Sequence, residues 1–357
     1  MMKRRNDIKR LRQLVGLLLV ALCMVACTTE TYPGDSMAAD KDEPMPIRLR
    51  MRPNINIGTE EEEWPIAGRP MARATTDDSN SSLPTDDYYG VFIIDEETYQ
   101  NLADREASLA GYKTYGYVNE KAKLEGGELK REDGTYFVYP KAETQATSAY
   151  IFVYWPYKAD QTLTELMDGI EVSVDIDQSS SLKNSDVLAG WIKVSTTNGF
   201  KDVSSLASSS SYPKLKMFHV MSHLTIAYVH TAAADETLSA EMLNATLGNV
   251  HTKVKLNLFE SLQNNSISVS DANTPNEIKL TPNEYSKTPV DNKVTATFYA
   301  LVPPQNIETS GAYVKMTIID GAPQSSRNFY PSNPEDAPTA WAAGKKYKYN
   351  YTYVTGE

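Results

Sequence analysis

Cysteine is almost absent from this chain of 357 residues, which contains two, Cys23 and Cys27. Both lie within or directly after an apolar segment near the N-terminus. The remainder of the chain can therefore form no disulfide, and it offers neither a thiolate nucleophile nor a cysteine ligand for a metal. The fold must instead be stabilised by the burial of a hydrophobic core.

The sequence also lacks the motifs that mark common catalytic and cofactor sites. It contains no G-x-S-x-G, no H-E-x-x-H, no phosphate-binding loop and no glycine-rich dinucleotide turn. His219 and His223 would be roughly 13 Å apart on a strand, which is too far for one zinc ion. Residues 175–186 resemble a calcium loop but lack its turn glycine and its final glutamate. We therefore expect no enzymatic activity, no metal and no cofactor.

Positive charge is scarce outside the N-terminus. The formal net charge of the chain is -11, yet residues 1–26 carry six basic side chains and one acidic one, a net charge of +5. The rest of the chain therefore carries a charge of -16. Such a field disfavours binding to nucleic acid, and we expect no nucleic-acid partner.

The N-terminus predicts export. Its basic residues precede an apolar run at 14–26 that is too short to span a membrane, which is typical of a secretory signal peptide over residues 1–26. The run closes on Met24-Val25-Ala26-Cys27, which resembles the lipobox of bacterial lipoproteins. We therefore expect lipidation of Cys27, which would provide a membrane anchor. The alternative is an ordinary signal peptide with an incidental cysteine.

Residues 47–57 alternate between apolar and polar side chains. The apolar set consists of Ile47, Leu49, Met51, Ile55 and Ile57, and the polar set of three arginines and two asparagines. This period of two predicts a half-buried strand. Pro53 cannot donate a ladder hydrogen bond, which indicates an edge strand or a strand with a break.

An acidic stretch that should be exposed follows this strand. Residues 60–63 are all glutamate, and basic residues come at Arg69 and at Arg73, directly before Ala74. Exposed tethers are the preferred sites of proteolysis. Cleavage after Arg73, or after Arg69 as second choice, would let the strand leave and would turn its place into a binding site. The alternative is a first strand followed by an uncut loop.

The remaining sequence predicts short strands separated by turns, with few helices. Strands are expected at residues 88–94, 111–118, 135–139, 149–154, 170–176, 186–194, 215–229, 254–259, 266–269, 294–302, 313–319 and 346–354, and helical segments at 97–109 and 241–247. The polar stretch 196–211 marks a domain boundary. We predict an all-β fold of two tandem antiparallel β-sandwich domains, 74–208 and 209–357, after a lipidated propeptide at 27–73.

The order of several short segments along the chain carries a family resemblance. They are Cys27, the Arg73-Ala74-Thr75 junction, and residues 89–92, 186–189, 218–226, 301–304 and 341–349. The ordered set resembles the fimbrillin family, the Mfa-like and FimA-like subunits of type V pili in Bacteroidales. It extends over nearly the whole chain, and no single segment is specific by itself.

The resemblance implies two transthyretin-like β-sandwich domains and export as an outer-membrane lipoprotein acylated, with palmitate, on Cys27. It also implies cleavage by an arginine-specific surface protease, carried over by position to Arg73, with Ala74 as the new N-terminus. The first strand is then lost, and another fimbrial subunit adds a strand in its place. The protein would thereby join a cell-surface fimbrium that serves adhesion, on a host or bacterial receptor that the sequence leaves open.

The C-terminus bears on the position within such a fimbrium. Stalk subunits of this kind continue past the tyrosine-rich strand with a strand that they donate, whereas this sequence stops at Glu357, shortly after Val354. We therefore expect a tip or accessory subunit, with stalk and anchor subunits as alternatives. A different class of function is a carbohydrate-binding surface lipoprotein that uses aromatic side chains such as Tyr154, Trp155 and Tyr157.

Overall fold

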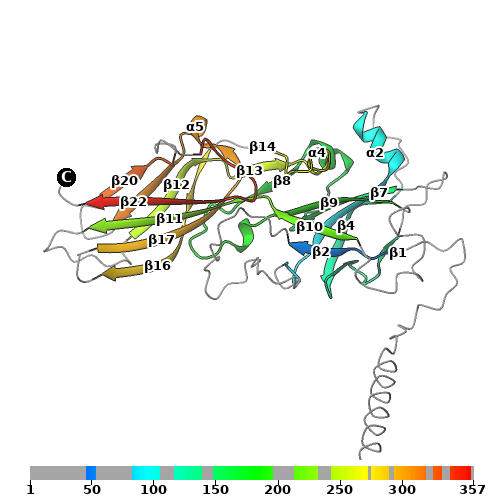
Figure 1. Ribbon diagram of the computed structural model, residues 1–357, viewed down its shortest axis with the longest axis horizontal. Coiled ribbons are helices and arrows are strands. Elements are labelled where there is room, and N and C mark those ends of the chain that lie inside the picture. Colours follow the sequence, from blue (N-terminus) through cyan, green and yellow to red (C-terminus); the bar gives the residue numbers. More distant parts are fainter. Residues whose placement is uncertain are drawn as a thin grey trace, which may run out of the picture. The chain divides into compact units, whose positions relative to one another are not determined.

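The structure, a computed structural model, confirms an all-β chain with few short helices (Figure 1). It describes residues 46–53, 83–104, 116–138, 148–195, 213–231, 243–271, 275–288, 293–318, 325–331 and 338–354. The chain divides into two compact units, and all described residues belong to one of them, Pro44–Lys201 together with Ser209–Glu357. None of the described helices is long and apolar enough to cross a membrane.

Seven strands of this unit, all within residues 50–219, close into a barrel. Their order around the ring is β10 (Lys214–His219), β2 (Arg50–Pro53), β5 (Glu128–Arg131), β4 (Gly116–Glu125), β3 (Tyr89–Asp95), β7 (Ser148–Trp155) and β9 (Leu188–Ser195). Strand β3, which lies between β4 and β7, is buried on both faces. Val91 and Ile93 face one hydrophobic core, while Phe92 and Ile94 face another. A continuous apolar run is the pattern expected of such a strand.

Two four-stranded sheets are formed by strands that follow β10 in the sequence. One has the order β16 (Thr281–Thr288), β17 (Lys293–Val302), β11 (Ser222–Thr231) and β22 (Lys346–Val354), and the other β15 (Asn276–Lys279), β12 (Leu243–Val250), β19 (Tyr313–Ile318) and β20 (Ser325–Phe329). Aromatic side chains connect the two sheets. The ring of Phe329 lies 5.8 Å from that of Tyr228 and 4.6 Å from that of Tyr351, between ring centroids.

Among the described residues, three small sheets and five short helical segments complete the architecture. The sheets are β1 (Pro46–Ile47) with β6 (Phe137–Val138), β14 (Val269–Asp271) with β13 (Lys253–Leu256) and β8 (Ile170–Ser173), and β18 (Gln305–Asn306) with β21 (Ala340–Trp341). The helices are α2 (Glu96–Ala103), α3 (Leu163–Asp168), η2 (Lys183–Ser185), α4 (Leu258–Asn264) and α5 (Ile307–Ser310). Side chains of Asp95, Thr162, Asn257 and Asn306 cap four of them.

The strand expected at 215–229 is instead two strands, β10 and β11, which belong to different sheets. The ladder breaks at Val220 and Met221, where the backbone bonds to other loops: the Val220 N–H donates to Val187 and the Met221 carbonyl accepts from Gly344. The helical turn expected at 241–247 is wrong, because residues 243–250 form β12 between β15 and β19. The strand expected at 254–259 ends at Leu256, because Asn257 caps α4.

The topology differs from tandem antiparallel sandwiches in two respects. The first sheet closes into a barrel, and two pairings, β2 with β10 and β11 with β22, are parallel. Strands also pair across the predicted domain boundary, since β10 follows it yet joins the barrel, while β8 precedes it yet pairs with β13. The division at residue 208 stays a prediction.

Candidate functional site

The segment predicted to be removable supplies two described strands, β1 and β2, which we call the leading segment (residues 46–53). Ile47 and Leu49 are each 1% exposed and Met51 is 0% exposed, so all three lie in the barrel core. The arginines between them are half-buried on the opposite face. The other predicted site residues lie outside the described part of the chain: Cys27, Ile55, Ile57, Arg69, Arg73 and Ala74.

The leading segment is hydrogen-bonded on both sides. The Arg50 N–H donates to the carbonyl of Pro213 at 3.0 Å, while the Met51 N–H donates to Gly127 at 3.2 Å. The Leu129 N–H in turn donates to Leu49 at 3.0 Å. Strand β2 is therefore not an edge strand, which Pro53 had allowed, whereas β1 pairs with β6 in a two-stranded sheet. The break lies between β1 and β2, and Pro53 is the last residue of β2.

We call the place of β2 between β5 and β10 the acceptor slot. Burying an aliphatic or methionine side chain stabilises a protein by about 1.5–3 kcal/mol, so three such side chains contribute roughly 5–9 kcal/mol. That amount is comparable with the whole net stability of a typical domain, about 5–15 kcal/mol. Loss of β2 would also turn the closed ring into an open sheet whose edges, β5 and β10, carry unpaired backbone groups.

A short hairpin places β5 next to β2. Gly126 and Gly127 connect β4 to β5 with φ values of 58° and 82°. Two consecutive positive φ values are required by the tight hairpin turn that matches the twist of antiparallel strands. The turn sets Glu128 directly opposite Arg50, as partners in the antiparallel pairing.

The outer face of the slot is charged. The Glu128 side chain is 14% exposed; its Oε2 accepts from the Tyr136 hydroxyl at 2.6 Å, and its Oε1 lies 3.9 Å from Arg50 Nε. Arg48 Nη2 donates to the same hydroxyl at 3.4 Å, and its guanidinium carbon lies 5.0 Å from the centre of the Tyr136 ring. Burial and the bond to Glu128 raise the pKa of Tyr136, an effect that Arg48 opposes. These contacts form one cation–carboxylate–phenol group.

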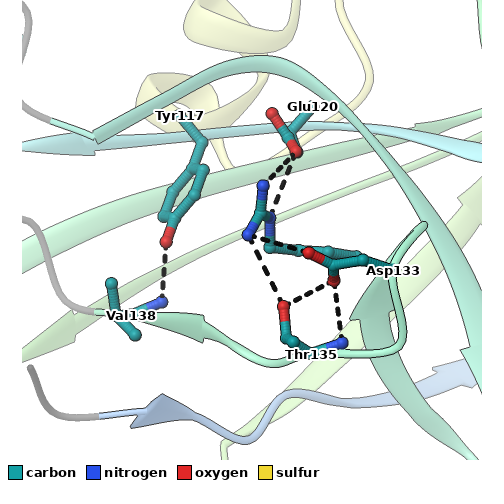
Figure 2. Close-up of polar contacts among 6 residues, drawn as sticks. Tyr117, Glu120, Asp133, Thr135 and Val138 are labelled. Atoms are coloured by element: carbon teal, nitrogen blue, oxygen red, sulfur yellow. Dashed lines mark hydrogen bonds and ion pairs between the residues drawn. The ribbon is translucent and has the colours of Figure 1, made fainter.

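The turn between β5 and β6 is held by an ion-pair network around Arg131 (Figure 2). Its Nε and Nη2 donate to Glu120 Oε1 at 3.1 and 2.9 Å, and its Nη1 lies 3.3 Å from Asp133 Oδ2. Asp133 Oδ1 accepts from the Thr135 N–H at 2.9 Å and from its hydroxyl at 2.5 Å. These bonds from Thr135, followed by Arg131, lower the pKa of Asp133. The network fixes the backbone directly before Tyr136.

A second contact positions β6, the partner of β1. The Val138 N–H donates to the Tyr117 hydroxyl at 3.1 Å (Figure 2). The Tyr117 ring meets Phe137 edge-on, with 5.1 Å between centroids, and Ile47 pairs with Phe137. Sequence reasoning missed Glu120, Glu128, Arg131 and Tyr136; the Gly126-Gly127 turn was the signal that β4 and β5 are neighbours.

The other candidates from the sequence that we consider next are either buried or paired within the fold. Tyr154 and Trp155 are buried, at 0% and 4% exposure, so their rings belong to the cores and not to a sugar-binding surface. In the 175–186 loop, Asp177 forms an ion pair with Lys279 at 3.0 Å and Asp186 contacts His219 at 2.9 Å. Within the described ranges, no group of three potential ligands could hold a metal ion.

The comparison with protein families agrees with the resemblance. A family model described as fimbrillin-like matches residues 72–357. Similar solved structures include proposed cell adhesion proteins from Bacteroides uniformis (TM-score 0.48, 16% identity, 89% of this chain and 95% of that chain) and Bacteroides ovatus (0.48, 15%, 88% and 94%). Another is the fimbrial anchor protein Mfa2 from Porphyromonas gingivalis (0.37, 9%, 87% and 91%). No curated protein matches the chain.

Proposed function

Because this chain belongs to the fimbrillin-like family, we propose that it is a subunit of a cell-surface fimbrium that serves adhesion, and that it joins other subunits by strand replacement. The observation that supports this proposal is the position of the leading segment. Its three apolar side chains complete the barrel core, and its backbone closes the ring between β5 and β10. A strand from another subunit would satisfy the same core and the same ladder.

Cleavage and strand loss are separate steps in this mechanism. Cutting after Arg73, or after Arg69, breaks the covalent connection but leaves the contacts of residues 46–53 intact. Because these contacts are worth several kcal/mol, the cut strand stays bound until an incoming strand replaces it. Cleavage therefore permits exchange, and the donor strand supplies the driving force.

The route to the cell surface follows from the N-terminus. Signal residues 1–26 direct export, acylation of Cys27 anchors the precursor in the outer membrane, and an arginine-specific surface protease releases the body from that anchor with Ala74 at its N-terminus. We propose a tip or accessory position for the subunit, with a stalk or anchor position as the alternatives. A tip or accessory subunit should be far less abundant than the stalk subunit in purified fimbriae.

N-terminal sequencing of the protein from the cell surface tests the cleavage step. We expect Ala74 as the first residue and heat-sensitive oligomers in gels. The double variant Arg69→Ala with Arg73→Ala should accumulate as an uncut monomer, whereas Lys130→Ala, which changes a basic residue of β5, should be cut normally. Continued assembly of the double variant would overturn the proposal.

A disulfide lock tests the strand-loss step independently. Arg50 and Glu128 are partners in an antiparallel pair flanked by hydrogen bonds of their neighbours, the geometry in which two Cα atoms are about 4.5 Å apart. That spacing suits a disulfide. Arg50→Cys with Glu128→Cys should be cut normally yet remain monomeric until it is reduced, while either single variant should assemble. Assembly of the oxidised double variant would exclude loss of this strand.

A further inference from the structure

We propose that the acceptor slot is closed at one end, so that a donor strand pairs with it only as far as the place of Pro53, and that this closed end fixes the register of the strand. This inference rests on the proposed strand replacement. It identifies the partner as a β-strand with apolar side chains at the places of Ile47, Leu49 and Met51, whose chain leaves the sheet directly after the place of Pro53.

Strands β2 and β22 occupy successive stretches of one edge, that of the line formed by β10 and β11. Both run parallel to their neighbour (Figure 1): β2 pairs with β10 up to Met217, and β22 pairs with β11 from His223 onward. Within a strand, the carbonyls of alternate residues point to the same side. The carbonyl of Pro213 accepts from β2, so that of His219 points to the same edge, whereas the Val220 N–H donates to the other edge, toward β9. The His219 carbonyl therefore lies between the two strands.

Gly344 fills that interval. A side chain at Gly344 would place its Cβ 2.9 Å from the His219 oxygen, and the Gly344 N–H donates to the Met221 carbonyl at 3.3 Å. Its φ of 64° lies in the left-handed region, which also favours glycine. A donor strand can therefore bond to this edge as far as Met217, because Gly344 lies against the next carbonyl that the ladder would need.

The opposite edge of the slot ends at the same level. The Met51 N–H donates to Gly127, and directly before Gly127 the chain turns back into β4, whose Glu125 pairs with Glu128. Within the described chain, β5 therefore has no residue opposite the place of Pro53. An N–H at Pro53 would point toward β5, as that of Met51 does, so proline loses no ladder bond there.

The stop, which we define as residues 342–345, is held independently of the leading segment. The Ser222 hydroxyl donates to the Ala342 carbonyl at 2.8 Å, and the Ala342 N–H donates to the Tyr347 hydroxyl at 2.8 Å. These partners belong to β11 and β22. The stop should therefore stay in place when the leading segment leaves.

The apolar pattern alone leaves the register open. A slip by one residue would turn every side chain to the other face, whereas a slip by two keeps the faces. In the sequence, Met45 precedes Ile47 with the same spacing, so a slip of two places would fill the slot with Met45, Ile47 and Leu49. Such a slip would also push the chain past the place of Pro53 and into the stop, which therefore excludes this register.

Peptides of different length test the closed end. The full-length precursor is cut in its tether with trypsin and mixed with fluorescein-labelled peptides, and uptake is measured by native gel and fluorescence anisotropy. We expect residues 46–57 to bind within about threefold of residues 46–53, because the added Ile55 and Ile57 gain no burial in the slot. In an open slot these two side chains would strengthen binding by more than about a hundredfold. Residues 48–57, which lack Ile47, are the control and should bind at least about tenfold more weakly than residues 46–57.

Disulfide cross-linking reads the register directly. In protein carrying Glu128→Cys, a peptide with Arg50→Cys reports the native register, and one with Arg48→Cys reports a slip of two places toward the stop. In peptides of residues 44–57, Arg48→Cys should cross-link at least about tenfold more slowly than Arg50→Cys. Shortening the Arg48→Cys peptide to residues 44–51 removes the part that would meet the stop, and should accelerate its cross-linking at least about fivefold.

The outcomes separate this inference from the proposed function. A gain of about a hundredfold for residues 46–57 over residues 46–53 would overturn the closed end and leave strand replacement standing. Equal cross-linking of the long and the short Arg48→Cys peptides would likewise overturn it. Failure of every peptide to enter the cut protein, including residues 46–57, would overturn both.

Discussion

The side-chain amide of Gln178 forms two hydrogen bonds with the backbone of Leu301. Nε2 donates to the Leu301 carbonyl at 2.8 Å, and Oε1 accepts from the Leu301 N–H at 2.9 Å. Gln178 is 0% exposed and lies 123 residues before its partner. Its amide therefore acts as a neighbouring strand would, and it joins the loop after β8 to β17.

Replacing Gln178 should strongly destabilise the fold. Gln178→Ala leaves a buried N–H and a buried carbonyl of Leu301 without this partner, and each such group costs about 1–3 kcal/mol. We expect the free energy of unfolding in urea to fall by roughly 2–5 kcal/mol. Gln178→Glu should cost as much, because a carboxylate oxygen then faces the Leu301 carbonyl. Gln100→Ala, which removes an exposed bond to Glu96, is the matched control and should change little.

The core side chains of the leading segment should contribute as much as those of other strands. Leu49→Ala should lower the free energy of unfolding of the uncut protein by about 2–5 kcal/mol, because it opens a cavity in the barrel core. Ile176→Ala, at a side chain 55% exposed, should change it by less than about 0.5 kcal/mol. An equal and small effect of both changes would mean that the leading segment adds little to the core.

The alternation of apolar and polar residues correctly predicted two of the strands. The alternation at 47–51 correctly placed Ile47, Leu49 and Met51 on one buried face, and the tyrosine-rich strand has the expected bounds, Lys346–Val354. Residues 215–229 were predicted as one strand because Phe218, Val220, Leu224, Ile226 and Tyr228 share one face, although Ser222 interrupts that face directly after the break between β10 and β11. That break arises because the two halves pair with different sheets, which is tertiary information.

The same limit explains why the acceptor slot was only half predicted. The sequence predicted β2, which fills the slot, as a strand with an apolar face. The residues that surround β2 come from segments far away in the sequence. Glu128 and Tyr136 are eight residues apart and meet through the turn that Arg131 holds, and β10 begins more than 160 residues after β2. Period-two patterns give the face of a strand, whereas its neighbours and their charges depend on sheet order.

The buried His223 should make the fold sensitive to acid. Burial, followed by the charges of Lys346 and His219, lowers its pKa from 6.5 to about 3. Between pH 6.5 and 3, His223 is therefore protonated in the unfolded chain but not in the folded chain. The stability of the fold is full above pH 6.5 and falls as the pH drops toward 3. The loss should reach roughly 3 kcal/mol at pH 4.5. Urea unfolding of His223→Gln at pH 7 and 4.5 should show a flatter dependence; an unchanged slope would contradict this assignment.

His219 should have the opposite pH dependence. Burial lowers its pKa, but the charge of Asp186 and its hydrogen bond at 2.9 Å outweigh burial, so that the net pKa is raised. Its contribution to stability is full below the unfolded value of 6.5 and is lost as the pH rises through the folded value. His219→Gln should therefore destabilise the protein more at pH 6 than at pH 9. Equal destabilisation at both values would mean that the charge on His219 contributes nothing.

The Arg131 network should control how firmly the leading segment is held. Arg131→Met removes the ion pairs to Glu120 and Asp133, which are about one-third exposed on the arginine side and so worth about 1 kcal/mol together. The loss should fall on the turn that positions β6 and, through the pairing of Phe137 with Ile47, on β1. Amide hydrogen exchange in residues 46–53 should become about fivefold faster, while exchange in β7 stays unchanged. Lys183→Met, which breaks an exposed pair with Asp86 at 3.0 Å, is the control and should leave residues 46–53 unaffected. If Arg131→Met left their exchange unchanged too, the turn would not hold the leading segment, and the slot would depend on β5 and β10 alone.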